Sequence, residues 1–296
     1  MQIGPEMRRR LNEIGIMQGR LSPPVPGRLQ AFPWTSWERE FSLARACGFE
    51  TIEWLFEATD YEQNPIWTET GLERIRSQIA ATGIHVRSVC ADYFMAHPFF
   101  RVSERERMHS VGILNTLIVR AATVGVEILL LPVLEVSEIR TDTEKMQLLD
   151  ALREPLYLAV ARGIRLGLET ELPAPEYRDL VERGNHPALG VYYDTGNASA
   201  RGYDIAADIN TLSPFLCGVH IKDRKRDGPS VLLGQGDADF AAFFSAIAEI
   251  GYTATLVLET AFGDDYLRVA QTHLMFVRDQ LVRCSKAAES TSGVSG

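Results

Sequence analysis

The sequence predicts a single closed (β/α)8 barrel, and three observations lead to this fold class. Short β-rich runs alternate with longer amphipathic segments from residue 13 to about residue 284, which is typical of repeated βα units. Eight such runs occur, and no linker separates two halves of the chain. The length of 296 residues also suits one barrel, since this fold needs about 250 residues. These features favour a closed barrel over an open doubly wound sheet.

The elements follow one another in a regular order. The predicted strands cover residues 13–19, 50–56, 85–91, 126–133, 164–170, 189–195, 216–222 and 254–260. The predicted helices cover residues 36–47, 68–82, 103–123, 142–162, 175–184, 202–211, 238–250 and 264–284. We therefore expect a barrel domain over 13–285, preceded by an N-terminal arm over 1–12. The final segment, 286–296, is low in apolar residues and is predicted to be disordered.

Composition excludes several classes of partner. The formal net charge of −9 disfavours a nucleic-acid or anionic-membrane surface, because both need a basic field. No apolar stretch approaches 18 residues, and the N-terminus lacks the apolar core of a secretory signal, so we expect a cytoplasmic protein. The four cysteines form no CxxC motif, which indicates reduced structural thiols.

An acidic or histidine side chain lies at or near the end of each of the last four predicted strands. The runs "LGLET" (166–170) and "LVLET" (256–260) place Glu169 and Glu259 in nearly the same setting, and Asp194 and His220 end the two strands between them. Side chains alternate between the barrel interior and the helix layer, so inward-facing ends would bring these four together. The intervening positions, expected to face the helices, are apolar or aromatic: Leu168, Tyr193, Val219 and Leu258.

Three carboxylates that converge in an apolar barrel would repel one another unless a cation lies between them. The sequence therefore predicts a divalent metal site formed by Glu169, Asp194, His220 and Glu259. A mostly oxygen donor set with one imidazole suits Mn²⁺, which we expect first, and also Mg²⁺ or Co²⁺. Zn²⁺ stays an alternative.

Several motifs resemble those of the xylose-isomerase-like barrel superfamily, in particular its sugar-phosphate isomerase/epimerase branch, which contains ketose 3-epimerases. The resemblance covers about residues 13–283 and is carried by "GIMQGRLSPP" (15–24), "IEW" (52–54), "LETE" (168–171), "DTGN" (194–197), "GVHIKDR" (218–224), "LGQGDADF" (233–240) and "LVLET" (256–260).

The resemblance implies a function for the predicted metal site. In these ketose 3-epimerases Glu, Asp, His and Glu on the last four strands hold the metal, in the order of Glu169, Asp194, His220 and Glu259. The two glutamates would also exchange the C3 proton of a ketose through an enediolate. Epimerisation and aldose–ketose isomerisation both fit this chemistry, and a homo-oligomer, either dimer or tetramer, stays open.

Other residues are candidates for contacts with a sugar or sugar phosphate. Asn197 stands where the free-ketose epimerases have a histidine, and Arg226 matches their arginine six residues beyond the metal-binding histidine. The loop "KDRKRDGPS" (222–230), which begins at Lys222, is basic and predicts either a phosphate clamp or a solvated loop. Arg20 ends the first strand, and Trp34 lies in the long Pro-rich connection 20–35. Weaker candidates for supporting or hydroxyl-binding groups are Glu53, Asp92 and Glu171.

Three other functions compete with the epimerase or isomerase. An endonuclease relative of the superfamily is disfavoured, since such enzymes use several additional histidines and a basic DNA-binding face. A metal-dependent dehydratase of a keto-inositol would need an acid for the departing hydroxyl, and the sequence shows no clear candidate. A non-catalytic sugar-binding barrel is less consistent with two retained glutamates, because a binding protein needs fewer buried charges.

Overall fold

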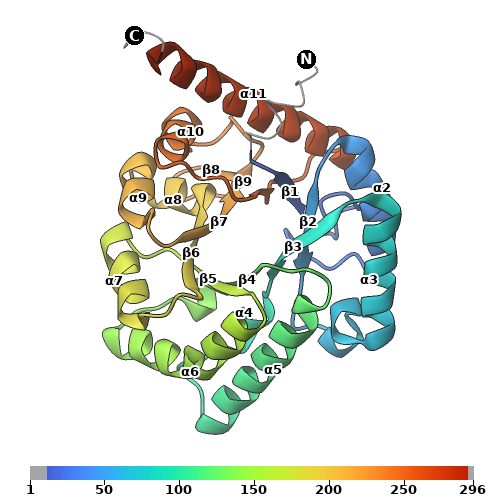
Figure 1. The fold of residues 1–296 in the computed structure, drawn as a ribbon, viewed down its shortest axis with the longest axis vertical. Coiled ribbons are helices and arrows are strands. Elements are labelled where there is room, and N and C mark those ends of the chain that lie inside the picture. The colour runs from blue at the N-terminus through green and yellow to red at the C-terminus, as the bar shows by residue number, and fades with distance from the viewer. Residues whose placement is uncertain (1–11, 293–296) are drawn as a thin grey trace.

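Eight parallel strands close into a barrel in the computed structural model, which describes residues 12–292 and, for side chains, only the part up to residue 284 (Figure 1). The strands are β1 (Ile14–Met17), β2 (Thr51–Leu55), β3 (His85–Cys90), β4 (Ile128–Val133), β5 (Arg165–Thr170), β6 (Leu189–Asp194), β7 (Leu216–Ile221) and β10 (Leu256–Leu258). Around the barrel their order is β1-β10-β7-β6-β5-β4-β3-β2. The predicted fold class is confirmed, and each strand lies inside its predicted range.

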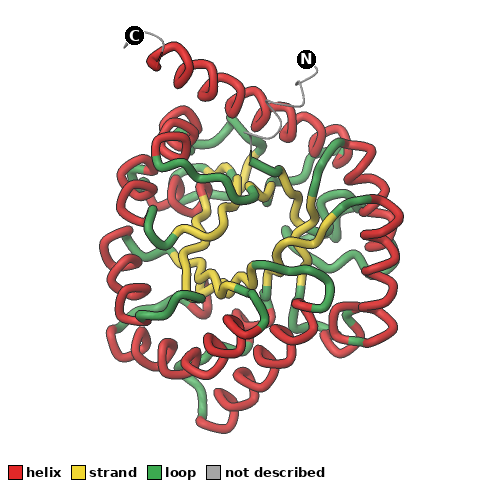
Figure 2. Tube along the Cα trace, viewed as in Figure 1, coloured by secondary structure: helices red, strands yellow, loops and turns green. Residues whose placement is uncertain are grey.

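Helices form an outer ring around the strands (Figure 2). They are α2 (Trp37–Cys47), α3 (Glu69–Thr82), α4 (Tyr93–Ala96), α5 (Glu104–Ala122), α6 (Asp142–Ala161), α7 (Ala174–Gly184), α8 (Thr195–Arg201), α9 (Ile205–Leu212), α10 (Phe240–Glu249) and α11 (Tyr266–Ser292), with short 3-10 turns η1 (Tyr61–Gln63), η2 (Pro65–Trp67) and η3 (Glu135–Ser137). Over the described residues, none of these helices combines the length and apolar character needed to cross a membrane.

Three features differ from the expected order of elements. The predicted helix 202–211 is α9, and the separate helix α8 precedes it, ending where Gly202 adopts a φ of 70°. A small antiparallel hairpin, β8 (Asp223–Arg224) with β9 (Ser230–Val231), occupies the basic loop after β7. Helix α11 continues to Ser292, past the predicted helix end at residue 284. Residues 1–11 and 293–296 lie outside the described part, and the N-terminal arm and the disordered tail stay predictions.

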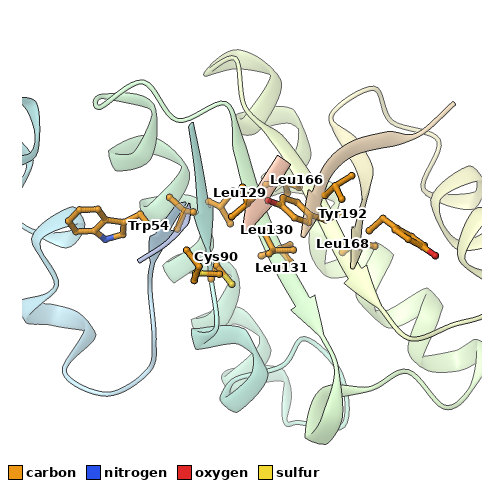
Figure 3. Close-up of a cluster of buried hydrophobic side chains, with 14 of the residues drawn as sticks. Trp54, Cys90, Leu129, Leu130, Leu131, Leu166, Leu168 and Tyr192 are labelled. Atoms are coloured by element: carbon orange, nitrogen blue, oxygen red, sulfur yellow. The ribbon is translucent and has the colours of Figure 1, made fainter. Parts of the chain in front are cut away.

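The helix-facing side of the barrel is a continuous apolar layer. Leu129 and Leu131 of β4 are in register with Leu166 and Leu168 of β5, and all four are fully buried (Figure 3). Tyr193 of β6 also faces outward, because its hydroxyl donates a hydrogen bond to Asp208 of α9 at 3.0 Å. Burial of these side chains supplies the main stabilising free energy between strands and helices.

The barrel interior pairs small residues with a large one. Tyr192 of β6 points inward, and its ring fills the space left by Gly167 of β5 and Gly218 of β7. A Cβ atom built on Gly218 would lie 2.3 Å from Tyr192 Cε2, and one on Gly167 would lie 3.2 Å from Tyr192 Cβ. These glycines therefore allow an aromatic ring to lie below the carboxyl ends of the strands.

We predict that Gly218→Ala lowers the free energy of unfolding by about 1–3 kcal/mol, because the added methyl group overpacks the barrel interior against Tyr192. Urea denaturation followed by circular dichroism measures this change. Gly112→Ala is the matched control, since Gly112 is exposed on α5 with open space around its Cα. Alanine there should stabilise the helix by about 0.5–1 kcal/mol. Equal effects of the two substitutions would contradict the packing described for Gly218.

Candidate metal centre

Four buried side chains converge at the carboxyl ends of the strands. Glu169 comes from β5, Asp194 from β6, His220 from β7, and Glu259 directly follows β10. One ligand atom from each residue can be chosen so that all lie within 4.8 Å of one another. The structure thus brings together the four residues that were predicted as metal ligands, and we call them the quartet.

The His220 nitrogen that faces the three carboxylates of the quartet, Nδ1, makes no hydrogen bond. His220 Nδ1 lies 3.1 Å from Glu259 Oε2 and 3.8 Å from both Glu169 Oε1 and Asp194 Oδ2. This nitrogen and Asp194 Oδ2 are fully buried without a hydrogen-bond partner. Buried polar atoms are almost always paired, so two such atoms facing each other indicate a missing partner. A divalent cation fits this donor set.

The second carboxylate oxygen of Asp194 is held by the chain itself. Asp194 caps helix α8, and its Oδ1 accepts a hydrogen bond from the backbone N–H of Asn197 at 2.7 Å. The Asn197 side chain in turn donates to Glu169 Oε1 at 3.1 Å, while its own oxygen accepts from Arg224 Nη1 at 2.9 Å. These bonds orient one ligand directly and a second through the amide of Asn197.

Two buried cations lie beside Glu259. Lys222 Nζ donates to Glu259 Oε1 at 3.1 Å and lies 3.7 Å from Asp194 Oδ2. Arg20 Nη2 lies 3.9 Å from the same Glu259 oxygen, and its Nε donates to the carbonyl oxygen of Thr260 at 2.8 Å.

These charges act differently on the two acids. Burial acts to raise the pKa of Glu259, but the charges of Lys222 and His220 outweigh it and hold this pKa well below its ordinary value. Burial raises the pKa of Asp194 to about 7, against the opposing charge of Lys222. A divalent cation bound between the three carboxylates would stabilise their ionised forms.

A cavity of about 660 Å³ lies next to the quartet. Asn197 and Lys222, which contact the quartet, also line this cavity. Its wall carries charged side chains of both signs: Arg201, Arg224, Glu135, Glu138, Glu171 and Asp227. Arg201 Nε donates to Glu171 at 3.1 Å, and Arg224 Nη1 lies 3.6 Å from the same carboxylate. Both arginines in the cavity wall are thus already paired with the carboxylate of Glu171.

The remaining predicted substrate contacts lie in different places. Arg20 is buried at the barrel mouth, with its guanidinium over the ring of Phe262. Trp34 is 38% exposed and packs edge-on against Phe32, and it is not among the residues that line the cavity. Arg226 is exposed, and its guanidinium lies over Gly202, away from the cavity wall.

Arg224 occupies the place in the cavity wall that was expected for Arg226. The reason is the β8–β9 hairpin, because it turns the chain so that Arg224 faces inward and Arg226 lies at the turn. Sequence reasoning did not single out Arg201 or Glu138. Arg201 ends the unpredicted helix α8, and Glu138 follows η3 in the β4–α6 loop, so only the fold brings the two to one cavity.

Comparison with known proteins agrees with this geometry. An L-ribulose-5-phosphate 3-epimerase, UlaE, of Salmonella heidelberg is 24% identical over 75% of this chain and 81% of its own. A Haemophilus influenzae protein, SgbU, whose name assigns it the same activity provisionally, is 26% identical over 76% and 83%. A solved L-ribulose 3-epimerase superposes with a TM-score of 0.77 at 21% identity, covering 95% of this chain and 98% of its own.

A protein-family model described as "Xylose isomerase-like TIM barrel" matches residues 41–279, which is most of the barrel. The matched segment includes all four residues of the quartet. With the closed barrel and this match together, the chain belongs to the xylose isomerase-like TIM barrel family.

Proposed function

We propose that this protein is a divalent-metal-dependent epimerase or isomerase of a ketose or ketose phosphate. The observation that carries the proposal is the quartet, in which two glutamates lie within reach of one buried cation site in a barrel of this family. The named relatives that epimerise L-ribulose 5-phosphate support a sugar substrate. We further propose Mn²⁺ as the ion, whereas a cytoplasmic location and a homo-oligomer stay predictions.

Glu169, Asp194, His220 and Glu259 would hold the ion. When bound, a divalent cation polarises a carbonyl group and stabilises negative charge that develops as a neighbouring C–H proton leaves. One glutamate would remove the C3 proton of the ketose, and the other would return a proton to the opposite face of the resulting enediolate. Such positioned proton transfer contributes about 10²- to 10⁴-fold to a rate.

The surroundings of the two glutamates are not equivalent. Glu259 lies beside Lys222 and Arg20, so its negative charge is stabilised by two cations. Glu169 instead accepts a hydrogen bond from the neutral amide of Asn197. This asymmetry supports distinct proton-transfer roles, each glutamate serving one epimer.

We predict that metal removal abolishes activity. After EDTA dialysis, exchange of the C3 proton of a ketose with D₂O should stop, and Mn²⁺ or Co²⁺ should restore it. Thermal stability should fall as well, because a ligand at a hundredfold excess over its Kd contributes about 2.7 kcal/mol to the folded state. Asp194→Asn is the control and should show no stabilisation by Mn²⁺. Full activity in a preparation shown by elemental analysis to be metal-free would contradict the proposal.

We predict that Glu169→Gln and Glu259→Gln each lower net turnover at least about 10²-fold, since glutamine keeps the shape and an acceptor oxygen but cannot accept and release the transferred proton. One variant should still exchange the C3 proton of one epimer with solvent, because removal and return on one face need only one base. Nuclear magnetic resonance in D₂O measures both quantities, with metal occupancy determined in parallel. Near-normal turnover in both metal-loaded variants would exclude the two-glutamate mechanism and favour a lyase or binding role.

We predict that Arg224, and not Arg226, discriminates phosphorylated from free ketoses. Arg224→Ala should raise the KM for a ketose phosphate about 10- to 100-fold more than the KM for the free ketose, which is the range of one charged hydrogen bond. Arg226→Ala is the matched control and should leave the ratio of the two KM values unchanged. If Arg224→Ala left the ratio of the two KM values unchanged, the phosphate-clamp hypothesis would be wrong, and a free sugar would be the better substrate class.

A further inference from the structure

The other ring nitrogen of His220, Nε2, is hydrogen-bonded to a carboxylate on a strand that is not adjacent to β7. His220 Nε2 lies 2.5 Å from Oε1 of Glu53, a residue of β2. Both side chains are buried, and Glu53 has no solvent exposure. Among the described residues, Glu53 forms no ion pair with a lysine or arginine. A hydrogen bond to the His220 ring therefore stands where a buried carboxylate would otherwise need a lysine or arginine.

Two hydroxyl groups hold Glu53 in this position. Ser88 Oγ on β3 and the Tyr192 hydroxyl on β6 each donate a hydrogen bond to Glu53 Oε2 at 2.6 Å. The Tyr192 ring also packs edge-on against the His220 ring, with 4.7 Å between centroids. We call Glu53, Ser88 and Tyr192 the histidine clamp, since they come from three strands and act on one imidazole.

The clamp determines which His220 nitrogen carries the proton. The Glu53 carboxylate accepts hydrogen bonds from two hydroxyl groups and has no hydrogen of its own to donate. The imidazole must therefore supply the hydrogen of the bond between them, as Nε2–H. In the neutral imidazole, the form that binds a metal ion, the lone pair is then on the other nitrogen, Nδ1, which faces the carboxylates of Glu169, Asp194 and Glu259. This agrees with the observation that Nδ1 is buried and makes no hydrogen bond.

We propose that Glu53 is a positioning residue of the metal centre, and that with Ser88 and Tyr192 it fixes His220 in the tautomer and ring orientation that presents Nδ1 to the cation. The inference rests on the proposed metal-dependent function. A carboxylate behind a metal-binding histidine raises the basicity of the imidazole and restricts its rotation, and loss of such a partner costs about 10- to 100-fold in metal affinity.

The test measures metal binding directly and involves no substrate. Apo-protein is titrated with Mn²⁺ by isothermal calorimetry, and the visible spectrum of the Co²⁺ form reports the ligand field. Glu53→Gln should bind Mn²⁺ about 10- to 100-fold more weakly than the wild type and should change the Co²⁺ spectrum. Glu53→Asp, which keeps the charge but shortens the side chain, should recover part of the affinity.

Adjacent tyrosines supply a matched control. Tyr192→Phe removes the inward hydroxyl that donates to Glu53, whereas Tyr193→Phe removes the outward hydroxyl that donates to Asp208. Both changes delete one buried hydrogen bond on the same strand, so both should lower the melting temperature. Only Tyr192→Phe should weaken Mn²⁺ binding, and it keeps the test decisive if Glu53→Gln does not fold.

The outcomes separate this inference from the metal site itself. A wild-type protein that binds no Mn²⁺ or Co²⁺ would overturn both the metal centre and the clamp. The clamp alone would be overturned if the wild type binds metal and Glu53→Gln has the same affinity and Co²⁺ spectrum as the wild type. Where Glu53→Gln is unfolded, the same result for Tyr192→Phe would overturn it.

Discussion

The structure depends on one electrostatic constraint: three carboxylates and an imidazole meet where water is largely excluded. Burying charge in this way is costly unless each group has a partner. The chain supplies part of that compensation through Lys222, which contacts Glu259, and through Arg20 behind it. Two buried atoms, Asp194 Oδ2 and His220 Nδ1, are still left without a hydrogen bond. A divalent cation bound between them would give both atoms a partner and would stabilise the three carboxylates as well.

The barrel interior is arranged to support that centre from below. Gly167 and Gly218 leave space for the ring of Tyr192, and this ring carries its hydroxyl to Glu53. Glu53 then reaches His220 at the top of β7. Packing and hydrogen bonding are thus coupled, because a side chain added at Gly218 would displace the same tyrosine whose hydroxyl holds the carboxylate bonded to His220.

Much of the fold and the convergence of the quartet could be predicted because both obey local rules. Alternating β and α patterns identify strands, and a charged residue at the end of an apolar strand, as at Glu169 or Glu259, reports its place at the barrel mouth. Hydrogen bonds between residues far apart in the sequence cannot be recognised from a local pattern of this kind. Glu53 and His220 are 167 residues apart, and nothing in the strand "TIEWL" specifies its partner. The β8–β9 hairpin, which decides that Arg224 faces the cavity, depends on tertiary contacts of two short segments.

The charge pairs in the cavity wall bear on the choice of substrate. A phosphate clamp normally presents unpaired cations, but Arg201 and Arg224 here share the carboxylate of Glu171. A phosphate group would have to compete with that carboxylate for the two guanidinium groups, and the displaced Glu171 would then need another partner or water. A free sugar would leave these ion pairs intact and use them as hydrogen-bonding groups. Discrimination between the two substrate classes thus depends on how firmly Glu171 holds its arginines, and not on the number of basic residues in the loop.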